Sequence, residues 1–259
     1  MAVDLIIAGD SWGCGEWQVD PSNMDNLTNT HQGTEYFLKK RKYSVINVSA
    51  PGGSNLVTWY RLRHIKHKSP IIVFQTDPFR DVLCYNTDWY YTEGIVKQGI
   101  KRPTPYPFSI QELTKAGLKD KKIFDLPVNL TLEQFLDRQN QMLDFFYQLL
   151  NKINQRIFMI GGCTKLNLSL MQKYPNLIPL VECFSEWLQP QIVHPPVWKN
   201  FGWNDWISDD TPPELVDFLY KSYQQQQDLI NFKYFPDGRH PDRHAHEKLA
   251  DLLEKVLTS

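Results

Sequence analysis

Long apolar runs are absent from this sequence. No stretch approaches the roughly 18 consecutive apolar residues that a membrane-spanning helix needs. The run Leu5 to Ala8 near the N-terminus follows an acidic residue, Asp4, and is too short for the apolar region of a secretory signal. We therefore expect a soluble protein without a signal peptide, cytoplasmic by default, and with no membrane partner.

Cysteine is scarce and charge is balanced. None of the cysteines forms a CxxC pair, and their spacing suits neither a zinc site nor a small disulfide scaffold; they are Cys14, Cys84, Cys163 and Cys183. His244 and His246 are two residues apart, so they do not share a helix face. The formal net charge of −1 creates no basic field for nucleic acid. We expect no metal, no nucleic-acid partner and mostly buried free thiols.

Glycine fingerprints for phosphate binding are also missing. Gly13-Cys14-Gly15 lacks the third glycine of a dinucleotide-binding loop, and there is no P-loop. The sequence therefore indicates no nucleotide cofactor, and we expect no cofactor of any kind.

What is present is an alternation of apolar strands and amphipathic helices. The 259 residues, 42% of them hydrophobic, suffice for one sizeable α/β domain, 1–259. Apolar runs predict strands, and stripes at helical spacing predict helices. The strands are expected at 3–8, 43–48, 71–74, 156–160 and 177–181, and the helices at 34–40, 54–67, 131–154, 213–230 and 241–257. This order predicts a three-layer α/β/α sandwich around a parallel, flavodoxin-like sheet of about five strands.

Two segments interrupt the alternation. Residues 82–130 and 184–211 are rich in aromatic residues and proline. Loops of this length inside a compact domain are usually functional insertions, lids or partner contacts. Their tryptophans either stack on sugar rings or fill a small satellite core.

The first candidate for chemistry is the serine of Gly9-Asp10-Ser11. This turn follows the first predicted strand, and ligands of parallel α/β sheets bind beyond the carboxyl ends of strands. Taken alone, the tripeptide serves far more often as an ordinary strand-to-helix turn than as a catalytic site.

The second candidate is Asp237-Gly238-Arg239-His240-Pro241 near the C-terminus. Histidine is the usual base for a serine hydroxyl, and a carboxylate orients its ring. Asp237 and His240 stand on a tight loop before a helix, which also fits a simple turn and helix cap.

Together, in this order, the two blocks resemble the SGNH (GDSL-like) hydrolase superfamily. That family has a GDS block after its first strand and a DxxHP block before its last helix. The resemblance implies Ser11 as nucleophile, His240 as base and Asp237 as its partner. A middle block, Asn47 to Asn55, resembles the family's glycine block and implies that Gly52, or its neighbour Gly53, donates a backbone N–H to the oxyanion together with Ser11.

One block departs from the family. Where the family has Gly-x-Asn-Asp, with its asparagine as the third oxyanion donor, this chain has Gln75-Thr76-Asp77 and then Arg80. An ionised Asp77 about 4 Å from the oxyanion would repel it by roughly 4 kcal/mol. Three arrangements avoid this conflict. Asp77 is protonated and donates; or it turns away to pair with Arg80, leaving Gln75 or Thr76 to donate; or the enzyme is weak or inactive. We favour the second, because Arg80 is nearby and always charged.

The expected activity is hydrolysis of a carboxylic ester through an acyl-enzyme on Ser11, with a small-molecule or glycan ester as substrate. An O-acetyl group on a carbohydrate is the first choice, because the aromatic insertions would flank the site, and a short-chain or lipid ester is the second. The alternative is a catalytically weak or inactive binding or assembly module that retains the fold.

Overall fold

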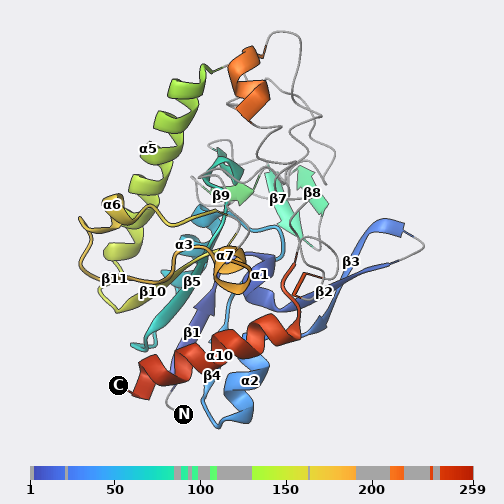
Figure 1. Ribbon diagram of the computed structural model, residues 1–259, viewed down its shortest axis with the longest axis vertical. Coiled ribbons are helices and arrows are strands. Elements are labelled where there is room, and N and C mark those ends of the chain that lie inside the picture. Colours follow the sequence, from blue (N-terminus) through green and yellow to red (C-terminus); the bar gives the residue numbers. More distant parts are fainter. Residues whose placement is uncertain are drawn as a thin grey trace.

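The sheet at the centre of the molecule has the predicted architecture (Figure 1). The computed structural model describes residues 3–20, 23–84, 89–92, 95–98, 106–109, 130–162, 164–190, 211–218, 234–235 and 240–258. Five parallel strands lie in the spatial order β4, β1, β5, β10, β11, which is the flavodoxin-like order. They are β1 (Leu5–Ala8), β4 (Val45–Asn47), β5 (Ile71–Gln75), β10 (Ile157–Gly161) and β11 (Leu177–Val181).

The two faces of the sheet carry separate hydrophobic cores. Successive side chains of a strand point to opposite faces. Leu5 and Ile7 therefore pack in one cluster, while Ile6 and Ala8 pack in the other. Because both faces of the strand are covered, its sequence is continuously apolar rather than alternating.

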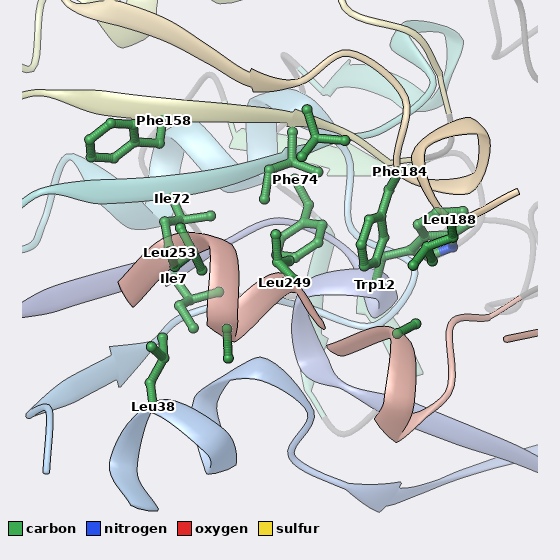
Figure 2. Packing of buried hydrophobic residues seen from close by; sticks show 14 of the residues in the cluster. Ile7, Trp12, Leu38, Ile72, Phe74, Phe158, Phe184, Leu188, Leu249 and Leu253 are labelled. Atoms are coloured by element: carbon green, nitrogen blue, oxygen red, sulfur yellow. The ribbon is translucent and has the colours of Figure 1, made fainter. Parts of the chain in front are cut away.

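Helices cover both faces, which confirms the three-layer prediction. On one face, α2 and α10 contact each other and bury Leu38 and Leu249 (Figure 2). On the other, α3 and α5 bury Leu62 and Leu143. The helices are α1 (Ser11–Cys14), α2 (Thr34–Lys40), α3 (Asn55–Leu62), α5 (Leu132–Asn151), α6 (Leu168–Met171), α7 (Phe184–Leu188) and α10 (Arg243–Thr258). Within the described ranges, no helix has the length and apolarity needed to cross a bilayer.

Helix boundaries follow capping chemistry where the sequence displays it. Thr131 caps α5 in a reciprocal box with Gln134, as predicted. Helix α3 ends at Leu62, short of the predicted 67, because its last turn tightens and the N–H of Ile65 bonds the carbonyl of Leu62. Of the helix predicted at 213–230, residues 213–218 are helical and the rest lies outside the described residues.

Additional strands lie outside the central sheet. In the first insertion, β6 (Asp81–Cys84) pairs with β9 (Tyr106–Ser109), and β7 (Trp89–Thr92) pairs with β8 (Ile95–Gln98). An unpredicted antiparallel hairpin of β2 (Glu16–Asp20) and β3 (Asn23–His31) follows α1. Sequence periodicity missed this hairpin because its strands are mostly polar and show little alternation.

Candidate active site

The candidate nucleophile lies at the carboxyl edge of the sheet, directly after β1. Gly9 has a φ of 148°, and a Cβ at this position would come within 2.7 Å of the Cβ of Phe74 on β5. Only glycine fits so close to the neighbouring strand. The carboxylate of Asp10 then caps α1 by accepting the N–H of Trp12 at 3.0 Å, and Ser11 is the first residue of this short helix.

The candidate base meets the nucleophile across the whole length of the chain. The Nε2 atom of His240 lies 3.1 Å from the Oγ atom of Ser11, and both residues are half-buried. This distance is within hydrogen-bond reach, so a neutral imidazole with its lone pair on Nε2 accepts the serine proton. Asp237, the predicted partner of His240, lies outside the described residues.

The glycine block leaves one backbone donor available beside Ser11. Gly53 donates its N–H to the carbonyl of Ala50 at 2.9 Å, so this N–H is already used in a turn. Gly52 has a φ of 67°, a conformation that favours glycine, and its N–H bonds no other described residue. The N–H of Ser11, at the start of α1, likewise has no partner within the described part of the chain. Of the two glycines, Gly52 is the one with a free donor.

The guanidinium of Arg80 pairs with Asp10 rather than with the carboxylate of Asp77, so the favoured prediction for this residue is wrong. The backbone N–H of Arg80 does donate to the carbonyl of Asp77, at 3.1 Å. An Nη atom of Arg80 lies 2.9 Å from a carboxylate oxygen of Asp10, and both side chains are buried. The same nitrogen donates to the carbonyl of Gly53 at 3.4 Å. Arg80 lies in the short 3-10 helix η1 (Pro78–Arg80), where it bridges the nucleophile loop and the glycine block. Asp10 is the nearer carboxylate because β1 and β5 are adjacent strands.

Asp77 is a completely buried carboxyl group with one engaged oxygen. Its Oδ1 accepts the N–H of Phe79 at 2.9 Å, whereas Oδ2 has no hydrogen-bond partner among the described residues. Burial raises the pKa of Asp77 to about 7, although the Phe79 N–H and the charge of Arg80 act in the opposite direction. Near neutral pH a substantial fraction of Asp77 is therefore protonated, which is the state that the first of the three arrangements requires.

Gln75 is not an available oxyanion donor, and this alternative is also wrong. Its amide nitrogen donates to the hydroxyl of Thr164 and to the carbonyl of Lys165, both at 2.9 Å. Its amide oxygen accepts the hydroxyl of Tyr147 at 2.6 Å. Both amide hydrogens are thus occupied by the loop after β10, and the amide oxygen joins β5 to α5.

The backbone after β5 is fixed by a residue that the sequence did not reveal. Asn55 at the start of α3 accepts the N–H of Thr76 and donates to its carbonyl, both at 2.9 Å. This reciprocal amide pair holds the glycine block against the end of β5. The hydroxyl of Thr76 is buried and has no hydrogen-bond partner in the described ranges.

Two further side chains lie beside Ser11. Trp17 on β2 donates its indole N–H to the carbonyl of Ser11 at 2.8 Å, and its ring lies 5.9 Å from that of His240. No local motif indicated this role. Cys14 is a poor nucleophile, because burial, and next the charge of Asp10, raise the pKa of its thiol to about 12.

The described residues contain no group of three or more histidine, cysteine, aspartate or glutamate side chains that could hold a metal ion. The polar contact at the candidate site is that between the hydroxyl of Ser11 and the imidazole of His240.

Comparison with known proteins gives matches among solved structures alone. No protein-family model matches the chain, and no curated protein matches it in sequence. The chain is similar to a GDSL-like lipase from Bacteroides thetaiotaomicron VPI-5482, with 9% identity, a TM-score of 0.38, and coverage of 98% of this chain and 87% of the other. It is also similar to an acetyl xylan esterase from the rumen bacterium Butyrivibrio proteoclasticus, with 14% identity, a TM-score of 0.36, and coverage of 99% and 64%. At this similarity, the activity has to be argued from the chain's own residues.

Proposed function

We propose that this chain is a serine esterase that hydrolyses a carboxylic ester through an acyl-enzyme on Ser11. The observation that supports the proposal is the 3.1 Å distance between Nε2 of His240 and Oγ of Ser11. Two residues separated by most of the sequence meet at the edge of the sheet where parallel α/β proteins bind ligands. A structural role alone does not require a hydroxyl and an imidazole in hydrogen-bond contact at this edge.

The reaction proceeds in two acyl-transfer steps. His240 takes the proton of Ser11 as the hydroxyl oxygen attacks the ester carbonyl, and the N–H groups of Ser11 and Gly52 stabilise the tetrahedral oxyanion. The C–O bond to the alcohol then breaks, and the imidazolium returns the proton to the departing alcohol. In the second step His240 takes a proton from water, which attacks the acyl group and releases the acid with Ser11 restored. In this proposal Asp237 orients the imidazole, as the resemblance implies.

An O-acetyl group on a carbohydrate is the substrate class that we place first, and a short-chain or lipid ester second. The aromatic insertions at 82–130 and 184–211 are the parts of the chain suited to contact a sugar. A screen of acetylated glycans against fatty-acyl esters separates the two classes.

The direct test uses Ser11→Ala with p-nitrophenyl acetate and a fluorophosphonate probe. We expect the variant to lose both hydrolysis and labelling, with a rate reduction of about 10⁴-fold or more. Its thermal unfolding should stay close to that of the unmodified chain, because Ser11 is half-buried and small. Turnover or labelling that is unchanged in Ser11→Ala would rule out the proposal.

A binding or assembly module is the competing function, and one observation favours it. An ionised Asp77 in place of an oxyanion donor opposes catalysis, and its Oδ2 atom has no partner among the described residues. A module of this kind would leave Ser11 unlabelled by fluorophosphonate in the wild-type chain at every pH.

A further inference from the structure

Trp17, a residue outside the predicted constellation, contacts both the candidate nucleophile and the candidate base. We propose that Trp17 is a positioning residue, which holds the imidazole of His240 against Ser11 and favours the cation that forms there during the reaction. This inference rests on the proposed esterase function. It assigns a role to the β2–β3 hairpin, which the sequence analysis did not predict.

The first contact fixes the nucleophile. Helix α1 has only four residues, Ser11–Cys14, so it gains little stability from its own hydrogen bonds. The indole N–H of Trp17 donates to the carbonyl of Ser11 at 2.8 Å. This bond supplies a partner to a carbonyl in the first turn and ties the backbone of Ser11 to β2.

The second contact restricts the base. The rings of Trp17 and His240 have centroids 5.9 Å apart and are tilted by 40°. The imidazole is therefore in contact with both the Ser11 hydroxyl and the indole ring, and packing against the indole restricts its rotation. When His240 accepts the proton it becomes a cation, and an indole within about 6 Å attracts a cation more strongly than a neutral ring. The contact thus favours the transition state over the resting state.

The hairpin that carries Trp17 bonds both α1, which contains Ser11, and α10, which follows His240. Glu16, the preceding residue, forms a 2.9 Å ion pair with Arg243 on α10, three residues after His240. On β3, Asn29 donates to the carbonyl of Cys14 in α1 at 3.2 Å. Trp17 and Asn29 are partners across the hairpin, so the bonds to the carbonyls of Ser11 and Cys14 come from one cross-strand pair. Strand β2 therefore links the nucleophile segment to the segment that bears the base.

The experiment compares Trp17→Phe and Trp17→Leu, with Trp59→Leu as the matched control. Phenylalanine keeps an aromatic face but loses the N–H, whereas leucine loses both. Trp59 on α3 is also half-buried, but it packs against the core on the other face of the sheet. We measure the rate of fluorophosphonate labelling, and kcat and KM for p-nitrophenyl acetate, after checking by thermal unfolding that each variant is folded.

We expect Trp17→Leu to lower the labelling rate and kcat about 30-fold, with KM changed by less than about twofold. Trp17→Phe should recover most of this loss and remain within about fivefold of the wild type. Trp59→Leu should match the wild-type rates. If Trp17 only filled space, phenylalanine would not restore the labelling rate and kcat lost with leucine, and kcat would not fall while KM stays nearly constant.

Wild-type rates in Trp17→Leu, or equal losses in the phenylalanine and leucine variants, would overturn the positioning role and leave the esterase proposal intact. Failure of the esterase proposal has a different signature. In that case wild-type chain is not labelled, or Ser11→Ala is labelled as fast as wild type, and both proposals are overturned together.

Discussion

At Asp77, burial and the nearby charge of Arg80 act on the carboxyl group in opposite directions. Its carboxyl group is fully buried, and its pKa is raised from an ordinary 3.8 to about 7 because burial penalises the charged form. The unfolded chain ionises near pH 4, whereas the folded chain holds the proton until about pH 7. The folded state therefore loses stability as the pH rises from about 4 to 7 and changes little above that range.

Asp77→Asn removes this pH dependence. The difference between 3.8 and about 7 corresponds to about 4 kcal/mol of stability. We expect the variant to be more stable than the wild type by up to that amount at pH 8, and nearly equal at pH 4. Urea unfolding at the two pH values measures the difference, and a wild-type advantage at pH 8 would contradict it.

The same variant reports on the oxyanion site. If Asp77 donates when protonated, as in the proposed esterase, the asparagine variant gains over the wild type as the pH rises through about 7. Loss of an oxyanion donor costs about 100-fold in kcat, so the ratio of variant to wild-type kcat should rise by about that factor between pH 5.5 and pH 9. A ratio independent of pH would show that Asp77 does not face the oxyanion.

At the scale of elements, one buried hydroxyl joins α5 to β5 in addition to the hydrophobic packing between them. The hydroxyl of Tyr147 donates to the amide oxygen of Gln75 at 2.6 Å and accepts the N–H of Asn167 at 3.2 Å. Burial, partly offset by the Asn167 N–H, raises the pKa of this hydroxyl far above its ordinary value of 10, so it remains a neutral donor. This bond orients the amide whose two hydrogens hold the loop after β10.

Tyr147→Phe leaves a buried amide oxygen without a donor. We expect a loss of about 1–3 kcal/mol in the free energy of unfolding, because an unsatisfied buried acceptor costs more than an average hydrogen bond contributes. The control is Tyr174→Phe, whose hydroxyl bonds the carbonyl of Asp144 in a less buried setting, and which should cost less than about 1 kcal/mol. Equal effects in chemical denaturation would contradict the role of Tyr147.

At the scale of the whole molecule, the C-terminal helix α10 covers one face of the sheet and directly follows the segment that bears His240. It packs on α2, and its buried His246 contacts the hydroxyl of Thr34 at 2.9 Å. Burial lowers the pKa of His246 from 6.5 to about 3. The unfolded chain therefore takes up a proton below pH 6.5 while the folded chain resists it. Stability is fully present above pH 6.5 and is lost as the pH falls from 6.5 toward 3.

We expect His246→Gln to weaken the acid sensitivity of the fold. The shift corresponds to about 5 kcal/mol over the full window, so wild type should lose several kcal/mol more than the variant between pH 7 and pH 4. His244→Gln is the matched control, because His244 lies on the exposed face of the same helix. Chemical denaturation at a series of pH values gives the slopes. Parallel slopes for the wild type and His246→Gln would refute the prediction.

The sequence by itself determined the features that depend on local pattern. Continuous apolar runs indicated the strands of the central sheet, and Thr131 with Gln134 indicated the start of α5. The GDS and DxxHP blocks indicated Ser11 and His240, which the structure brings to 3.1 Å. These features could be predicted because burial periodicity, helix capping and strand-end turns depend on residues that are close together in the sequence.

Only the tertiary structure decided which distant groups meet. Proximity along the chain suggested Asp77 as the partner of Arg80, but the adjacency of β1 and β5 brings Asp10 to it instead. The sequence left Gln75 as a possible donor, but in the fold its amide nitrogen bonds the loop after β10 and its amide oxygen bonds Tyr147. Trp17 reaches Ser11 and His240 because the β2–β3 hairpin carries it there, and the sequence of this hairpin has no periodic pattern that predicts it. Side-chain pairing follows from spatial neighbours, and the order of the strands in the sheet, rather than the order of residues in the chain, sets those neighbours.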